Sequence, residues 1–181
     1  TGKPMQNILL FISKLLIALF LIRFHANLYR LGFNNPLAQQ LNRHTDPLVL
    51  PFRKLLPPSR YDFGALAVAG IIALAISLVF TAAIHASFGV FIALFLTLII
   101  NTWLNTIFYA ILIIVIGSWL QTDPRQPVMQ IALACADWLM APLRRIIPPV
   151  GMIDFTPMAA LFVLYLAQSG INRLLLGGLI S

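Results

Sequence analysis

Charged side chains are scarce in this chain. Only 9% of its 181 residues are Asp, Glu, Lys or Arg, and 60% are hydrophobic. Ordinary soluble domains carry about 25% charged and about 45–50% apolar residues. This departure indicates that lipid is the solvent of the folded chain. Since one span needs roughly 20 apolar residues, the length allows about four or five membrane-spanning helices.

Cysteine is nearly absent as well. Cys135 is the only one, which excludes an intrachain disulfide and a cysteine-based metal site. The three histidines share no metal-ligand spacing, and neither a Gly-rich phosphate loop nor a Ser-His-Asp pattern occurs. Cys135 has no histidine near it in the sequence, so we interpret it as a small core-facing side chain. We expect no catalytic residue, no metal and no cofactor.

Acidic residues are fewer than basic ones. Five acids stand against twelve Lys and Arg, a net charge of +7. In a soluble protein this excess would indicate nucleic acid as a partner. In a membrane protein it is typical of the positive-inside rule and of contact with anionic lipid headgroups. We favour the second interpretation and expect anionic lipids, not nucleic acid, as partners.

Three apolar runs have the length of one membrane span each. They cover about 5–31, 63–84 and 157–176. We expect the first to be retained as a span, because no small-residue cleavage site follows it. Lys14 interrupts this run, and its long stem can reach toward the nearer interface.

A fourth run, 89–120, is longer than a bilayer requires. A helix of about 32 residues would measure ~48 Å, against ~30 Å of hydrocarbon core. Either the helix is strongly tilted, or a short apolar lead-in precedes a span at about 100–120, and we favour the lead-in. Asn101 and Asn105 lie on one face of this helix. Packing between spans is a commoner use of such side chains than a polar path.

Two segments between the spans combine a helical period with one apolar face. These segments are 36–56 and 127–147. We expect both to lie in the interface plane with the apolar face in the lipid boundary. Each contains a proline, Pro51 or Pro142, which should kink or break the helix at that point.

The two amphipathic segments share one motif. It reads Asp-x-x-x-x-Pro-x-Arg-Arg/Lys-x-x-Pro-Pro, and the copies that start at Asp46 and Asp137 lie 91 positions apart. An Asp-Phe pair follows each copy, at Asp62 and at Asp154. We therefore predict a tandem duplication.

The predicted fold class is an all-α membrane protein with four transmembrane helices in two tandem repeats. The first repeat is 5–84 and the second is 89–178, each a span, an amphipathic interfacial helix and a span. Two spans return the chain to its starting side, so the repeats are expected to be parallel. They would be related by a rotation of about 180° around the membrane normal.

The charged residues of the shared motif are the candidate site. The set is Asp46, Arg53, Lys54, Asp62, Asp137, Arg144, Arg145 and Asp154. Two interpretations stay open. The aspartate before the last span of each unit could pair with the basic residues across the Pro-Pro turn. Alternatively, the carboxylate serves the helix N-terminus and the basic residues bind lipid phosphate. Catalysis by these groups has little support.

The second copy of the motif resembles the YggT family, which is called YlmG in Gram-positive bacteria and plastids. The resemblance rests on residues 142–157, a Pro, a basic pair, Pro-Pro, a Gly-containing turn and Asp-Phe-Thr-Pro. In the first copy Ser59-Arg60-Tyr61 replaces the Gly-containing turn. The resemblance implies an integral bacterial inner-membrane protein. It also implies links to cell division, envelope or osmotic-stress tolerance, plastid nucleoid distribution and cytochrome assembly.

Two function classes follow from these observations. The first is a scaffold or assembly factor that binds other integral membrane proteins, with a homo-oligomer as a further partner class. The second is a transporter or channel with a path between the repeats. Transport sites usually contain ionisable groups within the membrane, whereas here these groups cluster at the interface, with Lys14 as the main exception. The scaffold is therefore the interpretation we favour.

The distribution of basic residues predicts the orientation. Nine of the twelve lie in or beside the amphipathic segments, so both segments should be cytoplasmic and both termini outside. The test is cysteine labelling at positions 39 and 130 in intact cells. An impermeant reagent applied from outside should leave both positions unlabelled, and labelling there would overturn the orientation.

Overall fold

The computed structural model describes residues 2–56, 59, 61–147 and 154–180. This part of the chain is all-helical, as predicted. The helices are α1 (Gly2–Leu28), the 3-10 turn η1 (Leu31–Phe33), α2 (Pro36–Leu55), α3 (Phe63–Ala83), α4 (Phe88–Trp119), α5 (Pro127–Ile146) and α6 (Thr156–Ile180). Four of them, α1, α3, α4 and α6, are long and apolar enough to cross a membrane.

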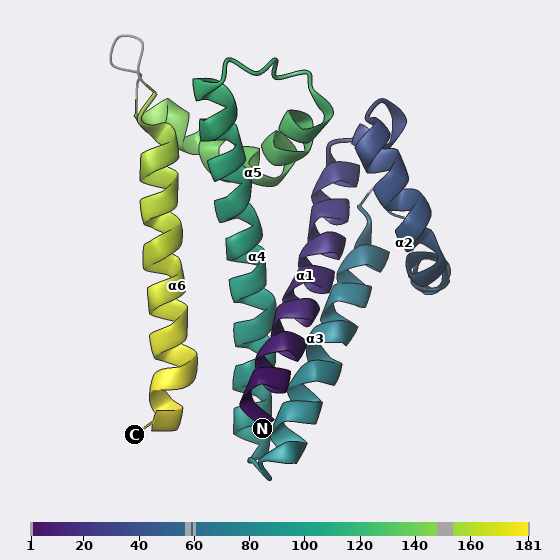
Figure 1. Ribbon diagram of the computed structural model, residues 1–181, viewed down its shortest axis with the longest axis vertical. Coiled ribbons are helices and arrows are strands. Elements are labelled where there is room, and N and C mark those ends of the chain that lie inside the picture. Colours follow the sequence, from purple (N-terminus) through teal and green to yellow (C-terminus); the bar gives the residue numbers. More distant parts are fainter. Residues whose placement is uncertain (1, 57–58, 60, 148–153, 181) are drawn as a thin grey trace.

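The long helices form one bundle with α4 in the middle. Figure 1 shows α1 and α3 on one side of α4 and α6 on the other. The short helices α2 and α5 lie in the half of the molecule away from both termini (Figure 1). The α3–α4 connection lies at the same end as the termini. Both amphipathic helices are thus placed toward one end of the bundle, while the superposition of the two halves stays a prediction.

The first helix ends earlier than the sequence indicates. We expected helix to about residue 31, but α1 stops at Leu28. Arg30 has a φ of 58°, in the left-handed region, and η1 begins at the next residue. A left-handed residue cannot continue a right-handed helix. Gln121, 91 positions later, also has a positive φ of 52° just after α4.

The favoured lead-in before residue 100 does not exist as a separate element. Helix α4 is continuous over 32 residues. No proline interrupts it, and Gly89 and Gly117 lie close to its ends. Its two parts also pack against different partners, since Leu98 belongs to the core of the first half and Ile107 to that of the second. The long helix therefore joins the two halves.

The prolines within the amphipathic helices do not break them. Helix α2 runs through Pro47 and Pro51, and α5 runs through Pro142. One proline removes one backbone hydrogen bond. Two residues before Pro51 and Pro142 lie Val49 and Met140, both fully buried. We attribute the continuity of both helices to this anchoring.

Each half has its own apolar core. The first consists of Ile17, Phe20, Leu21, Val49, Ala65, Val68, Ala69 and Ala73, with Leu98 from α4. The second consists of Ile107, Ala110, Ile111, Ile114, Ala132, Cys135, Ala136, Met140, Ala160 and Leu164. Trp103 packs against both. Small residues dominate α3 where it meets its neighbours, which lets helix backbones approach closely.

One such close approach is at Gly64, the second residue of α3. A Cβ added there would lie 2.7 Å from Arg53 Cγ, 2.9 Å from Val49 Cγ1 and 3.1 Å from the Val49 carbonyl oxygen. Because a backbone atom of α2 is among these neighbours, a methyl group would push the two helices apart. Gly70 lies in the same helix and has nothing within 4 Å of the same point.

Gly64→Ala should destabilise the protein by about 1–3 kcal/mol through overpacking. Gly70→Ala should be neutral or slightly stabilising, because alanine is the better helix former. Thermal unfolding in a mild detergent measures both. Equal midpoints for the two variants would contradict the tight α2–α3 contact.

Candidate functional site

Arg23, near the end of α1, is a charged residue whose side chain is fully buried. It is 1% exposed. Its Nε donates to Asp62 Oδ2 at 2.9 Å, and its Nη2 donates to Asp46 Oδ1 at 2.8 Å. One guanidinium therefore holds two of the candidate aspartates. It connects α1 with α2 and with the residue that precedes α3.

The third nitrogen of Arg23 is also paired. Nη1 donates to the carbonyl oxygen of Asn42 at 3.0 Å and to the Thr45 hydroxyl at 2.6 Å. All three nitrogens thus have partners on α2 or at the start of α3. A planar guanidinium with five donors suits this many acceptors, whereas a lysine ammonium does not.

Two asparagines complete the cluster. Asn27, one turn after Arg23, donates to Asp62 Oδ2 at 2.7 Å. Its side chain also exchanges hydrogen bonds of 3.1 and 2.9 Å with Asn42. We call Arg23, Asn27, Asn42, Thr45, Asp46 and Asp62 the Arg23 cluster. It fixes α2 to the spans by charge-assisted hydrogen bonds, which are the stronger kind.

The predicted pair across the first Pro-Pro turn is a secondary contact. Arg53 Nε lies 3.7 Å from Asp62 Oδ1, and this oxygen has no hydrogen bond within the described residues. Lys54 is exposed and forms no ion pair with any described residue. Asp62 does not cap α3 with its side chain either. In the first half, therefore, the carboxylate serves mainly Arg23.

The second half uses its aspartate differently. Arg144 Nε lies 3.7 Å from Asp154 Oδ2, and both side chains are 44% exposed. Asp154 Oδ1 also accepts a hydrogen bond of 2.9 Å from the backbone N–H of Thr156, the first residue of α6. The contact with Thr156, together with the positive charge of Arg144, lowers the pKa of Asp154. Asp154 thus accepts a hydrogen bond at the start of α6 and also pairs with Arg144, so both interpretations apply to it.

The remaining predicted residues of this half are not part of a cluster. Arg145 makes no ion pair within the described part of the chain, and the Pro148-Pro149 turn lies outside it. Asp137 accepts a hydrogen bond of 3.3 Å from the Tyr29 hydroxyl of the first half. Burial and the charge of Asp137 raise the pKa of Tyr29.

The two halves use their aspartates differently because the second half has no arginine at the position 91 residues after Arg23. That position holds Ile114, which belongs to the apolar core of the second half. The positions that match Asn42 and Thr45 hold Leu133 and Ala136. The second half therefore packs α5 with apolar side chains where the first half uses polar ones.

Polar side chains also join neighbouring helices elsewhere. Asn101 donates to Asn172 at 2.7 Å, and Gln168 donates to Asn105 at 2.6 Å. These amide pairs connect α4 with α6, the packing use that the sequence favoured. Between the halves, Asn35 donates to Gln130 Oε1 at 2.9 Å. Cross-helix hydrogen bonds of this kind contribute about 0.6–2 kcal/mol each in a membrane.

The described His, Cys, Asp and Glu side chains are scattered over the structure. No cluster of three His, Cys, Asp or Glu side chains occurs among the described residues. Cys135 is fully buried, and burial raises the pKa of its thiol to about 12. A thiol with such a pKa reacts slowly at neutral pH. It should not interfere with labelling of cysteines introduced at exposed positions.

Arg23, Asn27, Asn42 and Thr45 were missed by the sequence analysis. In the sequence Arg23 follows an apolar run, which is typical of a residue at a span boundary. The signal that could have found it was the expectation that helix continues past it, since a basic residue inside an apolar helix needs a partner. The sequence analysis named Asp46 and Asp62 and offered Arg53 or Lys54 as the partner of Asp62. The structure places Arg53 3.7 Å from Asp62 and Arg23, which was not offered, at 2.9 Å.

The fold and cluster define a four-span helical membrane protein with a buried arginine at one end. The sequence profile of the CCB3/YggT family matches residues 3–83 and 93–175. "Uncharacterized protein YggT" of Escherichia coli K12 is 30% identical over 175 residues, 94% of this chain and 92% of that protein. The chain belongs to the CCB3/YggT family.

Two further relatives match most of the chain. An uncharacterized protein of Haemophilus influenzae is 32% identical over 151 residues, 83% of this chain and 81% of that protein. An uncharacterized protein of Pseudomonas aeruginosa is 30% identical over 160 residues, 86% of this chain and 81% of that protein. No solved structure matches.

Asp62→Asn and Asp154→Asn should differ in their effect, although the two positions match in the shared motif. Asp62→Asn leaves Arg23 buried with one carboxylate fewer, which costs on the order of 3 kcal/mol. Asp154→Asn removes a half-exposed pair, which contributes less than about 1 kcal/mol. Thermal unfolding in mild detergent should therefore show a much larger drop for Asp62→Asn. Equal drops would contradict the role given to Arg23.

Proposed function

We propose that this protein is a non-enzymatic scaffold or assembly factor in the bacterial inner membrane, which holds other integral membrane proteins through its spans. The proposal rests on one observation: only a small share of each apolar span is buried by the rest of the chain. In α6 only 11% of the most apolar 18-residue stretch is buried, and in each of the other three spans 33% is. Such surfaces are available to lipid and to the spans of partners.

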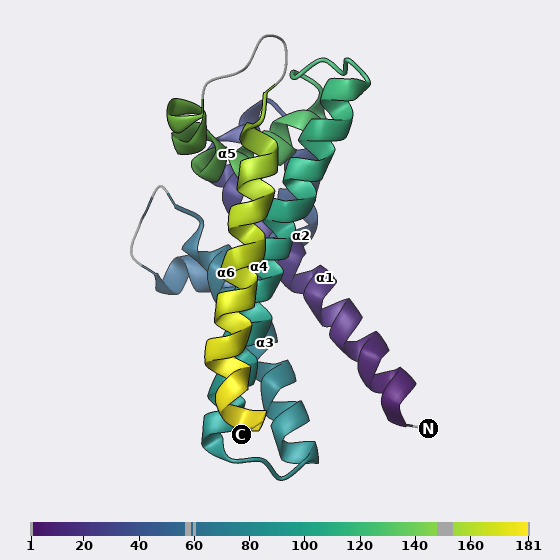
Figure 2. The ribbon, with the colours of Figure 1, turned by 90° about the vertical axis from the view of Figure 1, so that its left-hand side faces the viewer.

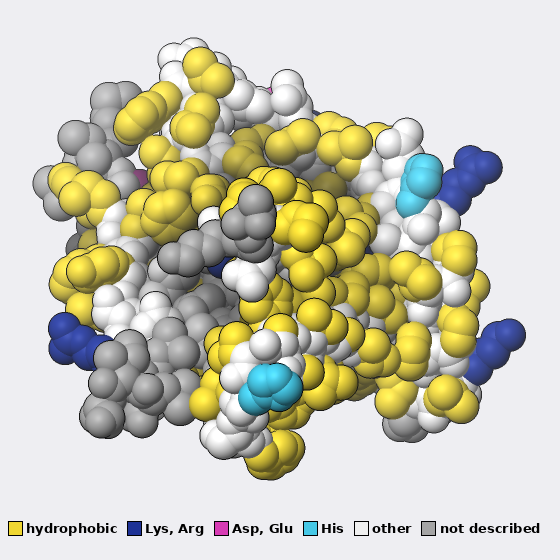
Figure 3. All heavy atoms as spheres, turned by 60° about the horizontal axis from the view of Figure 1, so that its bottom comes forward, with side chains coloured by type: hydrophobic (Ala, Val, Ile, Leu, Met, Phe, Trp, Pro, Cys, Tyr) yellow, Lys and Arg dark blue, Asp and Glu magenta, His cyan; other side chains and the backbone are white. Residues whose placement is uncertain are grey.

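The distribution of side chains on the surface supports this proposal. Figure 3 shows apolar side chains over much of the visible face, with the prominent Lys and Arg side chains at its margins. Outward-facing aromatic and aliphatic residues on α6 include Phe162 and Tyr165, both more than half exposed. Span–span association in membranes depends on van der Waals packing and a few polar contacts. The division, envelope and stress roles that the family resemblance implies all depend on membrane assemblies.

The charged groups support a structural role over a chemical one. Every nitrogen of Arg23 donates at least one hydrogen bond within the protein, and four of its five N–H groups are used in this way. The basic residues near α2 and α5 suit the cytoplasmic leaflet, where anionic lipid attracts each Lys or Arg by about 1 kcal/mol. We infer that α2 and α5 lie on this leaflet.

The second candidate function is a transporter or channel. A groove between α1, α4 and α5 includes Lys14, Thr102 and Asn105 among its lining residues and has a volume of about 510 Å³. A polar cleft of about 530 Å³ adjoins the Arg23 cluster. The two cavities share no lining residue. Because a conducting path would have to connect such spaces, the scaffold is favoured.

Two measurements separate these functions. Purified protein in sealed vesicles should give no more ion or solute flux than empty vesicles, since a scaffold needs no path. Affinity purification in mild detergent should recover the same membrane proteins each time, and polar substitutions of Phe162 and Tyr165 should reduce their yield. Matching substitutions at Leu55 and Ile146, exposed residues of α2 and α5, serve as controls. Protein-dependent flux together with no co-purifying membrane protein would overturn the proposal.

A further inference from the structure

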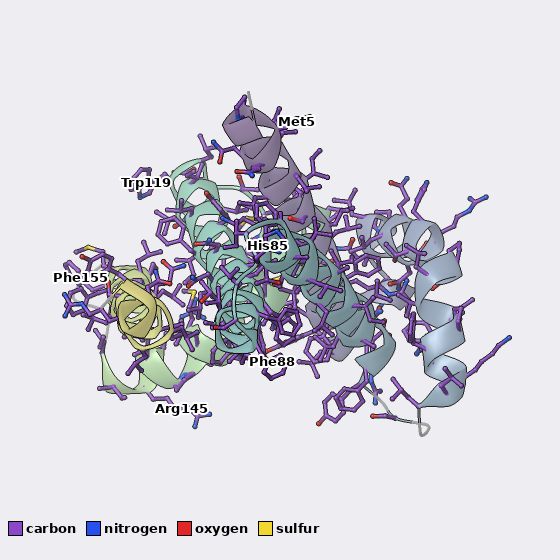
Figure 4. The ribbon with its side chains drawn as sticks, turned by 90° about the horizontal axis from the view of Figure 1, so that it is seen from below. Met5, His85, Phe88, Trp119, Arg145 and Phe155 are labelled. Atoms are coloured by element: carbon purple, nitrogen blue, oxygen red, sulfur yellow. The ribbon has the colours of Figure 1, made fainter. Side chains whose placement is uncertain are left out.

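The N-terminal half of α1 leaves an open groove against α4. Figure 2 shows α1 crossing the bundle, with its N-terminal end pointing away from α6 and from the lower part of α4. Figure 4 shows Met5 beyond the outer edge of the bundle, far from Phe88 at the start of α4. The groove lies between α1, α4 and α5 and is lined mainly by apolar side chains, of which Phe11, Leu15 and Tyr109 are more than half exposed. It is open to the lipid.

Lys14 lies in this groove at the middle of the membrane. Arg23 marks the level of the amphipathic helices, and nine residues of helix place Lys14 ~13.5 Å away from it. A hydrocarbon core of ~30 Å puts this position near the bilayer centre. The stem of a lysine side chain reaches roughly 6 Å, which falls short of either headgroup layer. A charge at this depth is costly unless it is paired.

This chain does not supply the partner. Lys14 forms no ion pair with the described residues, and all five acidic residues of the sequence are aspartates outside the first span: Asp46, Asp62, Asp123, Asp137 and Asp154. Each precedes or follows a span or lies in α2 or α5, at the end of the bundle away from the termini (Figure 1). A second copy in the same orientation would carry its acids at that same level. It could not place a carboxylate beside Lys14.

We propose that the groove receives a transmembrane helix of a different protein, and that this helix carries an Asp or Glu side chain at mid-membrane depth facing Lys14. The inference rests on the proposed scaffold function and names the chemistry of the partner. Small side chains line part of the groove, among them Ala18, Thr102, Thr106 and Ala110. Small residues let the backbones of two helices approach closely, so the groove suits a helix. Asn105 also lines the groove and offers a further polar contact to the incoming carboxylate.

The test uses a synthetic transmembrane peptide as the probe. A Leu/Ala host helix carries one Glu at its centre, and fluorescence energy transfer to the labelled full-length protein in phosphatidylcholine vesicles reports association. Wild type should bind the Glu peptide about tenfold more tightly than the all-apolar host. Lys14→Met should abolish this difference. Lys54→Met removes the same charge from α2 and should leave the difference intact.

A charge reversal makes the pairing explicit. Lys14→Glu should reject the Glu peptide and bind a host helix with one central Lys. Binding of the Glu and apolar peptides to wild type with equal affinity would overturn the inference, while co-purification of membrane proteins would still support the scaffold. Loss of Glu-peptide binding when phosphatidylglycerol is added would identify an anionic lipid as the occupant instead, and would also overturn it.

Discussion

The pairing of Arg23 is the interaction on which the first half of the structure depends. A guanidinium keeps its charge in any protein environment, so a buried arginine must be surrounded by acceptors or the helix that carries it cannot stay in place. Here the acceptors come from α2 and from the residue before α3. The requirement therefore holds three helices together: α2 is drawn against the spans, and α3 begins at the depth of Arg23. The close approach of α2 to α3 at Gly64 holds the same two helices together through van der Waals contact.

The two halves hold their amphipathic helices, α2 and α5, in different ways. Where the first half has Arg23, the second has Ile114 in an apolar core, and α5 is held by Met140, Ala136 and Cys135. Buried ion pairs are often no more stabilising than well-packed apolar side chains, but they fix geometry, and breaking one is costly. The first half thus has a single preferred arrangement of α2. The second half keeps its aspartates near the surface, with Asp137 in contact with Tyr29 and Asp154 beside Arg144.

The helices could be predicted closely from the sequence, and the cluster only in part. The helical period of their apolar residues places α2 and α5 within one residue of their observed ends. The end of α1 at Leu28 was not predictable from hydropathy, because a left-handed Arg30 depends on local packing. The continuity of α4 follows from its contacts with both cores, which hydropathy does not report. Arg23 was missed because a basic residue after an apolar run can either anchor a span boundary or be buried with a partner. The position of α2 against α1 decides between the two, and hydropathy does not report it.

Hydrogen–deuterium exchange of the Arg23→Met variant in detergent or nanodiscs tests this account most directly. If Arg23 holds α2 to the spans, amides of α2 should exchange faster in the variant. Those of α5, which has apolar anchoring at the matching position, should keep their wild-type rates. Unchanged exchange in α2, or equal acceleration in α2 and α5, would contradict the claim that this one side chain fixes the first half.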